Sequence, residues 1–310
     1  MTHKPQTHKA AGLVACGFFC TEVGLYAIMP IQSVFNHGVD GMEHKNVYDI
    51  RTSANALRTL INFTGVDLPI WEKFILRRRE YQYEDDLVSD VIRKFGCFPS
   101  SYEEWVFTYF HITTSANQCS SFKKHGILDL VHSYECKDSE LRTFLDDKNI
   151  KIDIESRILS FKQQTYDISF GECPPRFDRT AYACWSIGRK LYYDFTTCGF
   201  LSLWDAHPYG GYVHWRPEIL SDIDNLLNLT LSNEWHTSHK PYKIVATVQG
   251  HDIVYGGYDE QDIEHKVLNY LTKAYITAFG APSEHILLMK NGVQIPPEGI
   301  IDISPLECWW

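Results

Sequence analysis

The sequence predicts an α+β fold, in which an N-terminal helical region precedes a β-sheet whose strands alternate with helices. Residues 50–95 carry apolar side chains three and four positions apart, which is the period of amphipathic helices. From residue 105 onward, runs rich in β-branched and aromatic residues alternate with helical patterns, beginning with WVFTYFHIT. We therefore expect a mainly helical region at residues 1–104 and a second domain at residues 105–310.

The first elements follow from their local residues. Gly96 and Pro99 close the N-terminal helical run, and a strand comes after them. SANQCSSFKKHGIL reads as a helix that Ser115 caps and Gly126 ends, because glycine tolerates the left-handed geometry of a helix end. A short helix in ECKDSELRTFLDDKNIKID leads into a strand, and RILSFKQQTYDISFGE reads as two strands that a Pro-Pro pair ends.

The C-terminal half continues the alternation. FDRTAYACWSIGRKLYYDF fits a helix or a strand, and GGYVHWRPEILSDIDNLLNL reads as a strand or turn followed by a helix. YKIVATVQGHDIVY predicts a pair of strands, and EQDIEHKVLNYLTKAYITAFG predicts a helix that ends at Gly280. SEHILLMKNGVQIPPEGIIDI predicts a strand, a Pro-Pro turn and a last strand.

The composition is that of a soluble globular protein, with 44% apolar and 22% charged residues. Nine cysteines occur without a C-x-x-C pair, which argues against disulfides and a zinc knuckle and favours reduced thiols in a cytoplasm. Glu22 interrupts the apolar stretch at residues 10–35, so we expect a buried element there and no membrane span. His236 and His239 in WHTSH read as a polar loop, and no metal site is predicted.

Two polar residues stand where the local pattern calls for apolar ones. His111 lies inside the strand FHITT, where an imidazole needs hydrogen-bond partners once water is excluded. Glu284 opens the apolar strand HILLM, and a carboxylate at the mouth of a buried strand is placed for acid or base chemistry. Alone, a strand histidine is more often a satisfied core residue, and such a glutamate is more often solvated. Their occurrence together, in this order, favours a functional site.

The pair and its surroundings resemble the ADP-ribosyltransferase superfamily over residues 105–304. The His111 strand, an asparagine six residues on and a helix ending in Gly-Ile are similar to the first block of its histidine-type branch, which includes the DarT-like toxins. Glu284, its strand and IPPEGI (295–300) resemble the last block, in which the catalytic glutamate precedes a strand and a turn. IGRKLYYD (187–194) resembles the middle block of the His-Tyr-Glu branch.

The resemblance implies a split β-sheet core and a pentosyl transfer reaction with NAD as co-substrate. Such enzymes break the bond between nicotinamide and ribose through a transition state with oxocarbenium character, which a nearby carboxylate stabilises. By this resemblance Glu284 is the catalytic carboxylate and His111 binds the adenosine ribose. The other implied site residues are Thr113 and Asn117 beside His111, Tyr192 or Tyr193 stacked on nicotinamide, and Tyr166 as a competing middle-block residue.

The cluster WRPEIL (215–220) has two readings that the residues weigh equally. In the first interpretation, Trp215 and Arg216 contact a phosphate or the target. In the second, Pro217 is simply the first residue of a helix. The formal charge of −10 argues against salt-driven coating of nucleic acid. We therefore expect a nucleic-acid acceptor to be short and single-stranded, with RNA favoured, and to stack on aromatic residues. The aromatic residues that offer this platform are Trp204, Tyr209, Tyr212 and Trp215.

The expected function is transfer of ADP-ribose to a macromolecule, with nucleic acid favoured over protein, by a toxin or phage-defence effector that an antitoxin protein would accompany. Two other readings stay open. RNA 2'-phosphotransferases share the fold but lack the glutamate-headed last block, and a catalytically inactive ADP-ribosyltransferase-like module would bind a partner through its N-terminal helices. Release of nicotinamide from NAD separates the first reading from both others.

Overall fold

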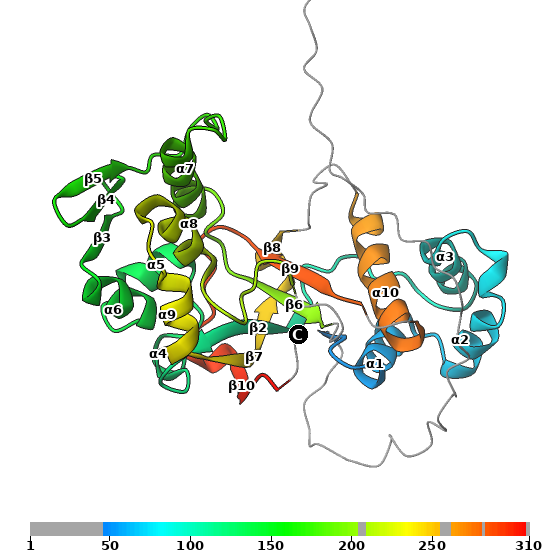
Figure 1. Cartoon of the computed structure of the whole chain (residues 1–310). Coiled ribbons are helices and arrows are strands. Elements are labelled where there is room, and N and C mark those ends of the chain that lie inside the picture. Colours follow the sequence, from blue (N-terminus) through cyan, green and yellow to red (C-terminus); the bar gives the residue numbers. More distant parts are fainter. Residues whose placement is uncertain (1–45, 204–208, 255–261, 281–282, 308–310) are drawn as a thin grey trace, which may run out of the picture. The chain divides into compact units, whose positions relative to one another are not determined.

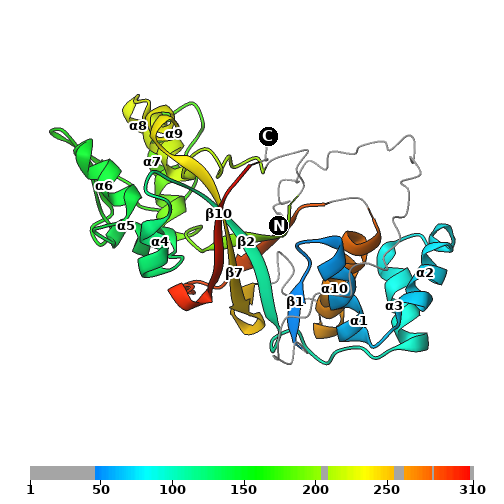
Figure 2. The same ribbon diagram turned by 90° about the horizontal axis from the view of Figure 1, so that it is seen from below.

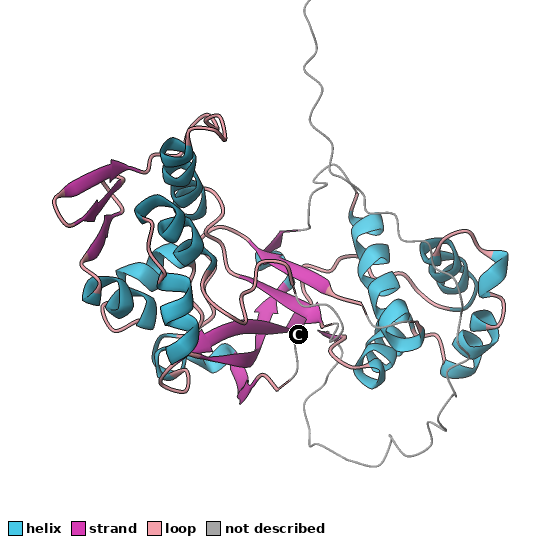
Figure 3. Cartoon of the chain, in the orientation of Figure 1, coloured by secondary structure: helices cyan, strands magenta, loops and turns pink. Residues whose placement is uncertain are grey.

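A seven-stranded, mostly antiparallel sheet organises the fold (Figure 1, Figure 3). The computed structural model describes residues 46–203, 209–254, 262–280 and 283–307. The strand order is β10-β7-β2-β6-β9-β8, with β1 paired to β2, and the predicted α+β class is confirmed. The strands are β1 (Val47–Asp49), β2 (Val106–Ser115), β6 (Cys198–Ser202), β7 (Lys240–Gln249), β8 (Ile253–Val254), β9 (His285–Met289) and β10 (Ile300–Pro305).

Residues 50–95 are helical, as their periodicity predicts. The side chain of Thr52 accepts a hydrogen bond from the Asn55 amide at the start of the first helix, and Gly65 ends that helix with a φ of 67°. Gly96 ends the third helix, as expected from the sequence. The elements are α1 (Ser53–Thr64), α2 (Leu68–Ile75), the 3₁₀ turn η2 (Arg78–Glu80) and α3 (Glu84–Phe95).

These helices share one hydrophobic core with the sheet. α1 and α3 pack against α10 (Ile263–Phe279), which lies beside α1 in Figure 2. Strand β1 pairs in parallel with β2, and the Tyr48 hydroxyl donates a hydrogen bond of 2.7 Å to the Tyr270 carbonyl. The described residues before and after position 105 belong to one compact unit. The expected domain boundary therefore does not coincide with a break in packing, because the apolar faces of the N-terminal helices are buried by C-terminal elements.

A second hydrophobic core lies among the elements that connect β2 to β7. The segment that fitted helix or strand is helical, because buried Ala183, Ile187 and Leu191 recur four residues apart. The second core also buries Trp235 and Tyr134. Its elements are α5 (Leu130–Glu135), α6 (Glu140–Asp147), the small sheet β3 (Ile150–Asp153), β4 (Ile158–Phe161) and β5 (Gln164–Asp167), then α7 (Arg179–Tyr192), α8 (Glu218–Leu227) and α9 (Leu231–Ser238).

The helix after β2 is shorter than the sequence predicts. α4 spans Ser120–His125, whereas Ser115, the expected cap, is the last residue of β2. The Ser115 hydroxyl accepts a hydrogen bond of 2.7 Å from the Cys119 amide, so it stabilises the turn between strand and helix instead of the helix end. Gly126 ends α4 as predicted, with a φ of 80°.

The C-terminal elements follow the prediction closely. A 3₁₀ turn, η3 (Gly250–Asp252), joins β7 to β8, and a second one, η4 (Pro297–Gly299), carries the Pro-Pro turn before β10. Gly280 ends α10 as expected. In the part of the chain that the structure describes, no helix is long and apolar enough to cross a membrane. The segment at residues 10–35 lies outside the described residues.

Candidate functional site

A cavity of about 720 Å³ opens where β2 and β6 part. His111 and Thr113 of β2, Phe200 of β6 and Ile286 of β9 line it, together with Lys273 of α10. Its volume falls in the range of small-molecule and cofactor sites, which is about 300–1,000 Å³. Ile286 and Leu288 are 45% and 39% exposed, and the side chains of both line this cavity. The strand HILLM is therefore buried on one face only.

The cavity exists because β2 and β6 pair at a single position. Phe110 is opposite Phe200, and the two strands share no further register pair. Gly199 permits even this contact, since a Cβ there would lie 2.3 Å from the Tyr109 ring and 2.6 Å from the Phe110 carbonyl oxygen. Beyond this point β2 continues to Ser115 without β6 beside it. The ladder between β2 and β6 thus stops at this position, which leaves a gap along the edge of β2 that borders the cavity.

His111 bridges this gap with its side chain. Its Nδ1 lies 3.0 Å from the carbonyl oxygen of Cys198 on β6, so Nδ1 carries the proton and donates. Burial lowers the pKa of His111, which keeps the ring neutral at physiological pH. In this tautomer Nε2 bears a lone pair and can accept a hydrogen bond from a hydroxyl. The ring of Phe122 on α4 lies 5.9 Å away, centroid to centroid.

Side chains from both faces of the sheet reach the cavity. Phe110, Phe200 and Ile286 occupy one cross-strand row and therefore one face. His111 follows Phe110 directly, so its side chain lies on the opposite face. Both groups line the same cavity because the gap between β2 and β6 connects the two faces.

Glu284 stands one residue before β9, as the sequence suggested. Its carboxylate is partly buried, and Oε2 is shielded from solvent with no hydrogen-bond partner among the described residues. Burial raises the pKa of this carboxyl. Glu284 is not among the residues that line the cavity, although Ile286, two positions on, is. In a regular sheet the observed register would separate the Cα atoms of His111 and Glu284 by about 14 Å.

The neighbours of Glu284 include a partly buried pair that the sequence patterns did not single out. His285 Nε2 lies 2.9 Å from the Ser283 hydroxyl, and Ser202 donates to the Ser283 carbonyl over 2.7 Å. Burial and the nearby charge of Lys273 lower the pKa of His285 to about 4. Burial lowers the pKa of Lys273 to about 8.

Lys273 is the cavity residue that sequence reasoning missed. It is partly buried within α10, and its Nζ lies 5.1 Å from the centre of the Tyr270 ring. It forms no ion pair with any described residue, whereas Lys190, the other lining lysine, is paired with Asp194 and Glu218. The signal available was a single lysine inside the apolar run NYLTKAYITAF, which also suits an ordinary solvent-facing helix position.

The other residues implied for NAD lie apart from the cavity lining. The Tyr192 hydroxyl donates to the Ile154 carbonyl at 3.1 Å, and Tyr193 is 66% exposed and stacks on Phe170. These two tyrosines end α7, which packs against the second core and not against β6. The Tyr166 hydroxyl donates to the side chain of Gln164 within the small sheet. Asn117 accepts from the Ser120 amide in the turn before α4.

The segment expected to hold the acceptor borders the cavity in part. Tyr209, Val213 and Pro217 line it, and Tyr209 packs edge-on against Phe200 with ring centroids 5.6 Å apart. Trp215 itself contacts Tyr212 and His236, with centroids 6.3 and 5.0 Å apart. Tyr212 is 50% exposed, and Arg216 donates a hydrogen bond of 3.5 Å to the Gly211 carbonyl. Pro217 immediately precedes α8. Trp204 lies outside the described residues.

The motif WHTSH belongs to a helix end and not to the expected polar loop. His236 lies in α9 and His239 is its C-terminal cap. His239 stacks on Trp235 with centroids 3.6 Å apart, and its Nε2 is 3.3 Å from Glu140 Oε2. The helix was missed because its buried apolar side consists of Leu231 and Trp235, and two residues are too short a pattern to reveal a helical period.

Comparison with known proteins adds no relative. No family model, no curated protein and no solved structure matches this chain. The chemistry of the cavity and its surroundings must therefore carry the functional argument.

Proposed function

We propose that this protein is an NAD-dependent ADP-ribosyltransferase. The observation that carries the proposal is His111, a neutral histidine at the gap between β2 and β6 whose Nδ1 is engaged and whose Nε2 can accept from a ligand hydroxyl. Glu284, with a buried carboxylate oxygen that has no hydrogen-bond partner among the described residues, precedes a strand that lines the same cavity. The Cα atoms of His111 and Glu284 would lie about 14 Å apart in a regular sheet of this register, and two groups at such a separation suit a dinucleotide, which presents two separate riboses.

In the proposed chemistry, Glu284 stabilises the transition state. Departure of nicotinamide leaves positive charge on the ribose, and a carboxylate beside that ribose stabilises the transition state more than the ground state. The acceptor nucleophile forms the new bond to the ribose carbon, nicotinamide takes the bonding electrons as it leaves, and the acceptor releases a proton. A carboxyl whose pKa is raised by burial is suited to take up that proton.

The remaining contacts follow from the cavity lining. His111, with Thr113 beside it, would hold the adenosine ribose. Lys273 is the lining cation without an ion-pair partner in the described chain, so it would meet the phosphates. Tyr209 lines the cavity, and we assign to it the stacking role that the family resemblance implied for Tyr192 or Tyr193.

The favoured acceptor is a base of single-stranded RNA or DNA, with RNA preferred. Support comes from the segment at residues 209–217, which borders the cavity and exposes Tyr212 for base stacking. A splayed base would present its exocyclic amine to the ribose carbon. Such an activity suits a toxin or antiphage effector, with an antitoxin protein as its partner.

The test measures two products of one incubation. Purified protein, NAD labelled in its adenylate half and total cellular extract should yield free nicotinamide and label bound to a macromolecule. Label that nuclease releases and protease does not would support a nucleic-acid acceptor, and the opposite pattern would identify a protein acceptor. Failure to release nicotinamide with any acceptor would overturn the proposal and leave the inactive binding module or the phosphotransferase.

A further inference from the structure

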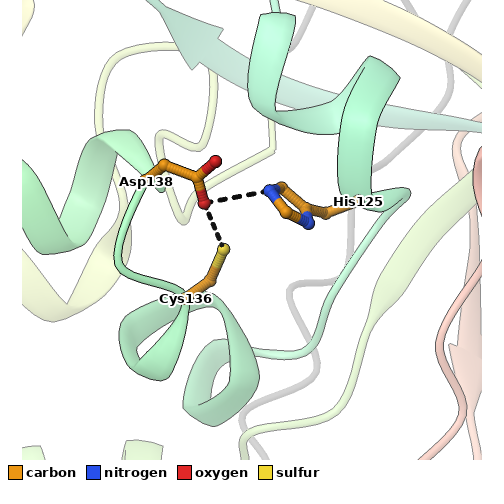
Figure 4. A group of neighbouring side chains, drawn as sticks. All are labelled: His125, Cys136 and Asp138. Carbon is orange, nitrogen blue, oxygen red and sulfur yellow. Dashed lines mark hydrogen bonds and ion pairs between the residues drawn. The ribbon is translucent and has the colours of Figure 1, made fainter.

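We propose that His125, Cys136 and Asp138 form a binding site for a divalent transition metal ion, with Zn²⁺ as the best fit. His125 is the last residue of α4, Cys136 follows α5 as its C-terminal cap, and Asp138 precedes α6. Figure 4 shows the three side chains directed toward one another. The fold brings these residues together from separate elements, so their spacing in the sequence does not predict a metal site.

The two contacts of Asp138 have the lengths of hydrogen bonds, and they are only a few tenths of an ångström shorter than the spacing that a bound metal would impose. Asp138 Oδ1 lies 2.9 Å from His125 Nε2 and 3.1 Å from Cys136 Sγ, and all three donors lie within 4.8 Å of one another. His125 Nε2 is shielded from solvent yet makes no well-aligned hydrogen bond, in spite of its closeness to Asp138. A contact that is short but misaligned is expected when both atoms converge on a third position.

Tetrahedral zinc geometry is compatible with these positions. Bonds of about 2.0–2.3 Å to nitrogen, oxygen and sulfur place neighbouring ligand atoms about 3.3–3.5 Å apart. The two contacts of Asp138 would therefore widen by a few tenths of an ångström, and His125 Nε2 and Cys136 Sγ, which lie within 4.8 Å of each other, would settle at a similar spacing. Three protein ligands leave a fourth position for water.

The donor set selects the class of metal. An imidazole nitrogen and a thiolate sulfur favour Zn²⁺ and its neighbours over Ca²⁺ and Mg²⁺, which prefer oxygen ligands. Without a metal, burial and the hydrogen bond to Asp138 raise the pKa of the Cys136 thiol. Binding would exchange the thiol proton for the ion, so one proton leaves as the sulfur–metal bond forms.

Lys124 orients the carboxylate of Asp138 without being one of the proposed metal ligands. Its ammonium forms an ion pair with Oδ2 of Asp138, the oxygen that does not face His125 and Cys136. This contact fixes the carboxylate and directs Oδ1 alone toward the proposed ion. The strong stabilisation of the charged Asp138 by Lys124 also holds its pKa well below the usual range.

The ion would fasten the wall of the cavity that faces His111. His125 precedes Gly126, which lines the cavity together with Phe122 of the same helix. A metal that joins the end of α4 to the connection between α5 and α6 would hold this wall in place. Metal binding is independent of NAD chemistry, so either proposal can fail without the other.

The experiment uses the full chain, stripped of metal with a chelator and kept reduced. Zn²⁺ is titrated in competition with a chromophoric chelator, and Co²⁺ is added separately to detect the thiolate-to-cobalt charge-transfer band. We expect one equivalent of metal with a submicromolar Kd, a cobalt thiolate band and a higher Tm. Cys136→Ser retains a hydroxyl that can donate to Asp138, and we expect it to lose the band and at least tenfold in zinc affinity.

Matched variants separate this site from unspecific binding. Cys173→Ser changes an exposed free cysteine and His132→Gln changes a neighbouring histidine, and both should bind metal as the parent does. His125→Gln and Asp138→Asn should weaken zinc binding as Cys136→Ser does. A parent protein that gives no charge-transfer band, or a band that persists in Cys136→Ser, would overturn the proposal. Equal zinc affinity in the parent and in Cys136→Ser would do so as well.

Discussion

The two edges of β2 behave differently although they belong to the same ten residues. One edge pairs with β7 without interruption from Val106 to Ser115. The other edge pairs with β1 near its start and with β6 only at Phe110, after which it borders the cavity. The paired edge gives the sheet its continuity, and the open edge gives it a site.

The difference shows how a sheet can carry polar chemistry without losing its core. The buried part of β7, Ile244–Val248, offers only apolar and threonine side chains to the paired edge. On the open side His111 and Lys273 line the cavity, and Glu284 and His285 lie at the start of β9, whose Ile286 also lines it. There His111 supplies a side-chain hydrogen bond to Cys198 O that a continuous ladder would have supplied from the backbone.

The largest expected effect concerns Glu284, immediately before β9. Glu284→Gln keeps the shape but removes the charge that faces the developing cation, and such contacts contribute about 100-fold or more to turnover. Nicotinamide release should fall accordingly, and growth inhibition in a bacterial host should disappear at equal solubility. Glu298→Gln, an exposed change in the IPPEGI turn, serves as the control. Full toxicity of Glu284→Gln would show that another residue is the catalytic carboxylate.

The second prediction concerns acid stability. The folded pKa of His285 is about 4, below its ordinary 6.5, so between these values the unfolded chain binds a proton that the folded chain does not. The free energy of unfolding should therefore fall as pH drops from 6.5 toward 4, by about 3 kcal/mol from this group. Urea titrations across this range should show a shallower fall in His285→Gln.

His251 provides the matched comparison, because its side chain is 63% exposed. His251→Gln should follow the parent at every pH. If His285→Gln also follows the parent, His285 does not resist protonation in the folded state, and the open side is less shielded than its burial suggests.

The third prediction tests the single contact that joins β2 to β6. Gly199→Ala places a methyl group against Tyr109 and the Phe110 carbonyl, and overpacking of this kind costs about 1–3 kcal/mol. Gly171→Ala has open space around the new Cβ and should change the free energy of unfolding by less than about 0.5 kcal/mol. Equal stability of both variants would mean that β2 and β6 can move apart at this contact without a cost in the free energy of unfolding.

The smallest effect is expected at His111. His111→Asn offers an amide donor to the Cys198 carbonyl but no acceptor at the Nε2 position, so NAD affinity should fall up to about tenfold, the worth of one hydrogen bond. His111→Ala should weaken NAD binding as well and cost at most about 1–2 kcal/mol of stability. Titration calorimetry measures the affinities.

Thr247→Val on β7, opposite Thr108, is the control from the paired edge and should leave NAD affinity unchanged. Unaltered affinity in both His111 variants would make His111 a structural link between strands and nothing more.

Local patterns predicted most elements, and they failed where partners are distant in the chain. Gly126, Gly96 and Gly280 ended helices as expected, because capping depends on a few adjacent residues. The sequence also identified His111 as a polar residue in a strand, but not its bond to Cys198, which depends on where β6 lies.

The same limit explains the less accurate predictions about the site. Tyr192 and Tyr193 matched a motif, yet which core a helix joins is decided by packing, and α7 joins the second one. Lys273 has no local feature that distinguishes it from a solvated lysine. The proposed metal site needs three elements to meet, so its donor residues show no recognisable pattern in the sequence.

The position of β2 between distant partners also bears on synthesis. Its main partner, β7, begins roughly 125 residues later, so at about 5–20 residues per second a ribosome would finish β2 some 6–25 s before that pairing can form. During this interval β1 can pair with the start of β2, but the edge that later meets β7 is unpaired along its whole length, a state prone to association with other chains. We expect nascent chains that stop between β2 and β7 to need chaperones, and full-length chains to refold slowly because their strand contacts are far apart in sequence.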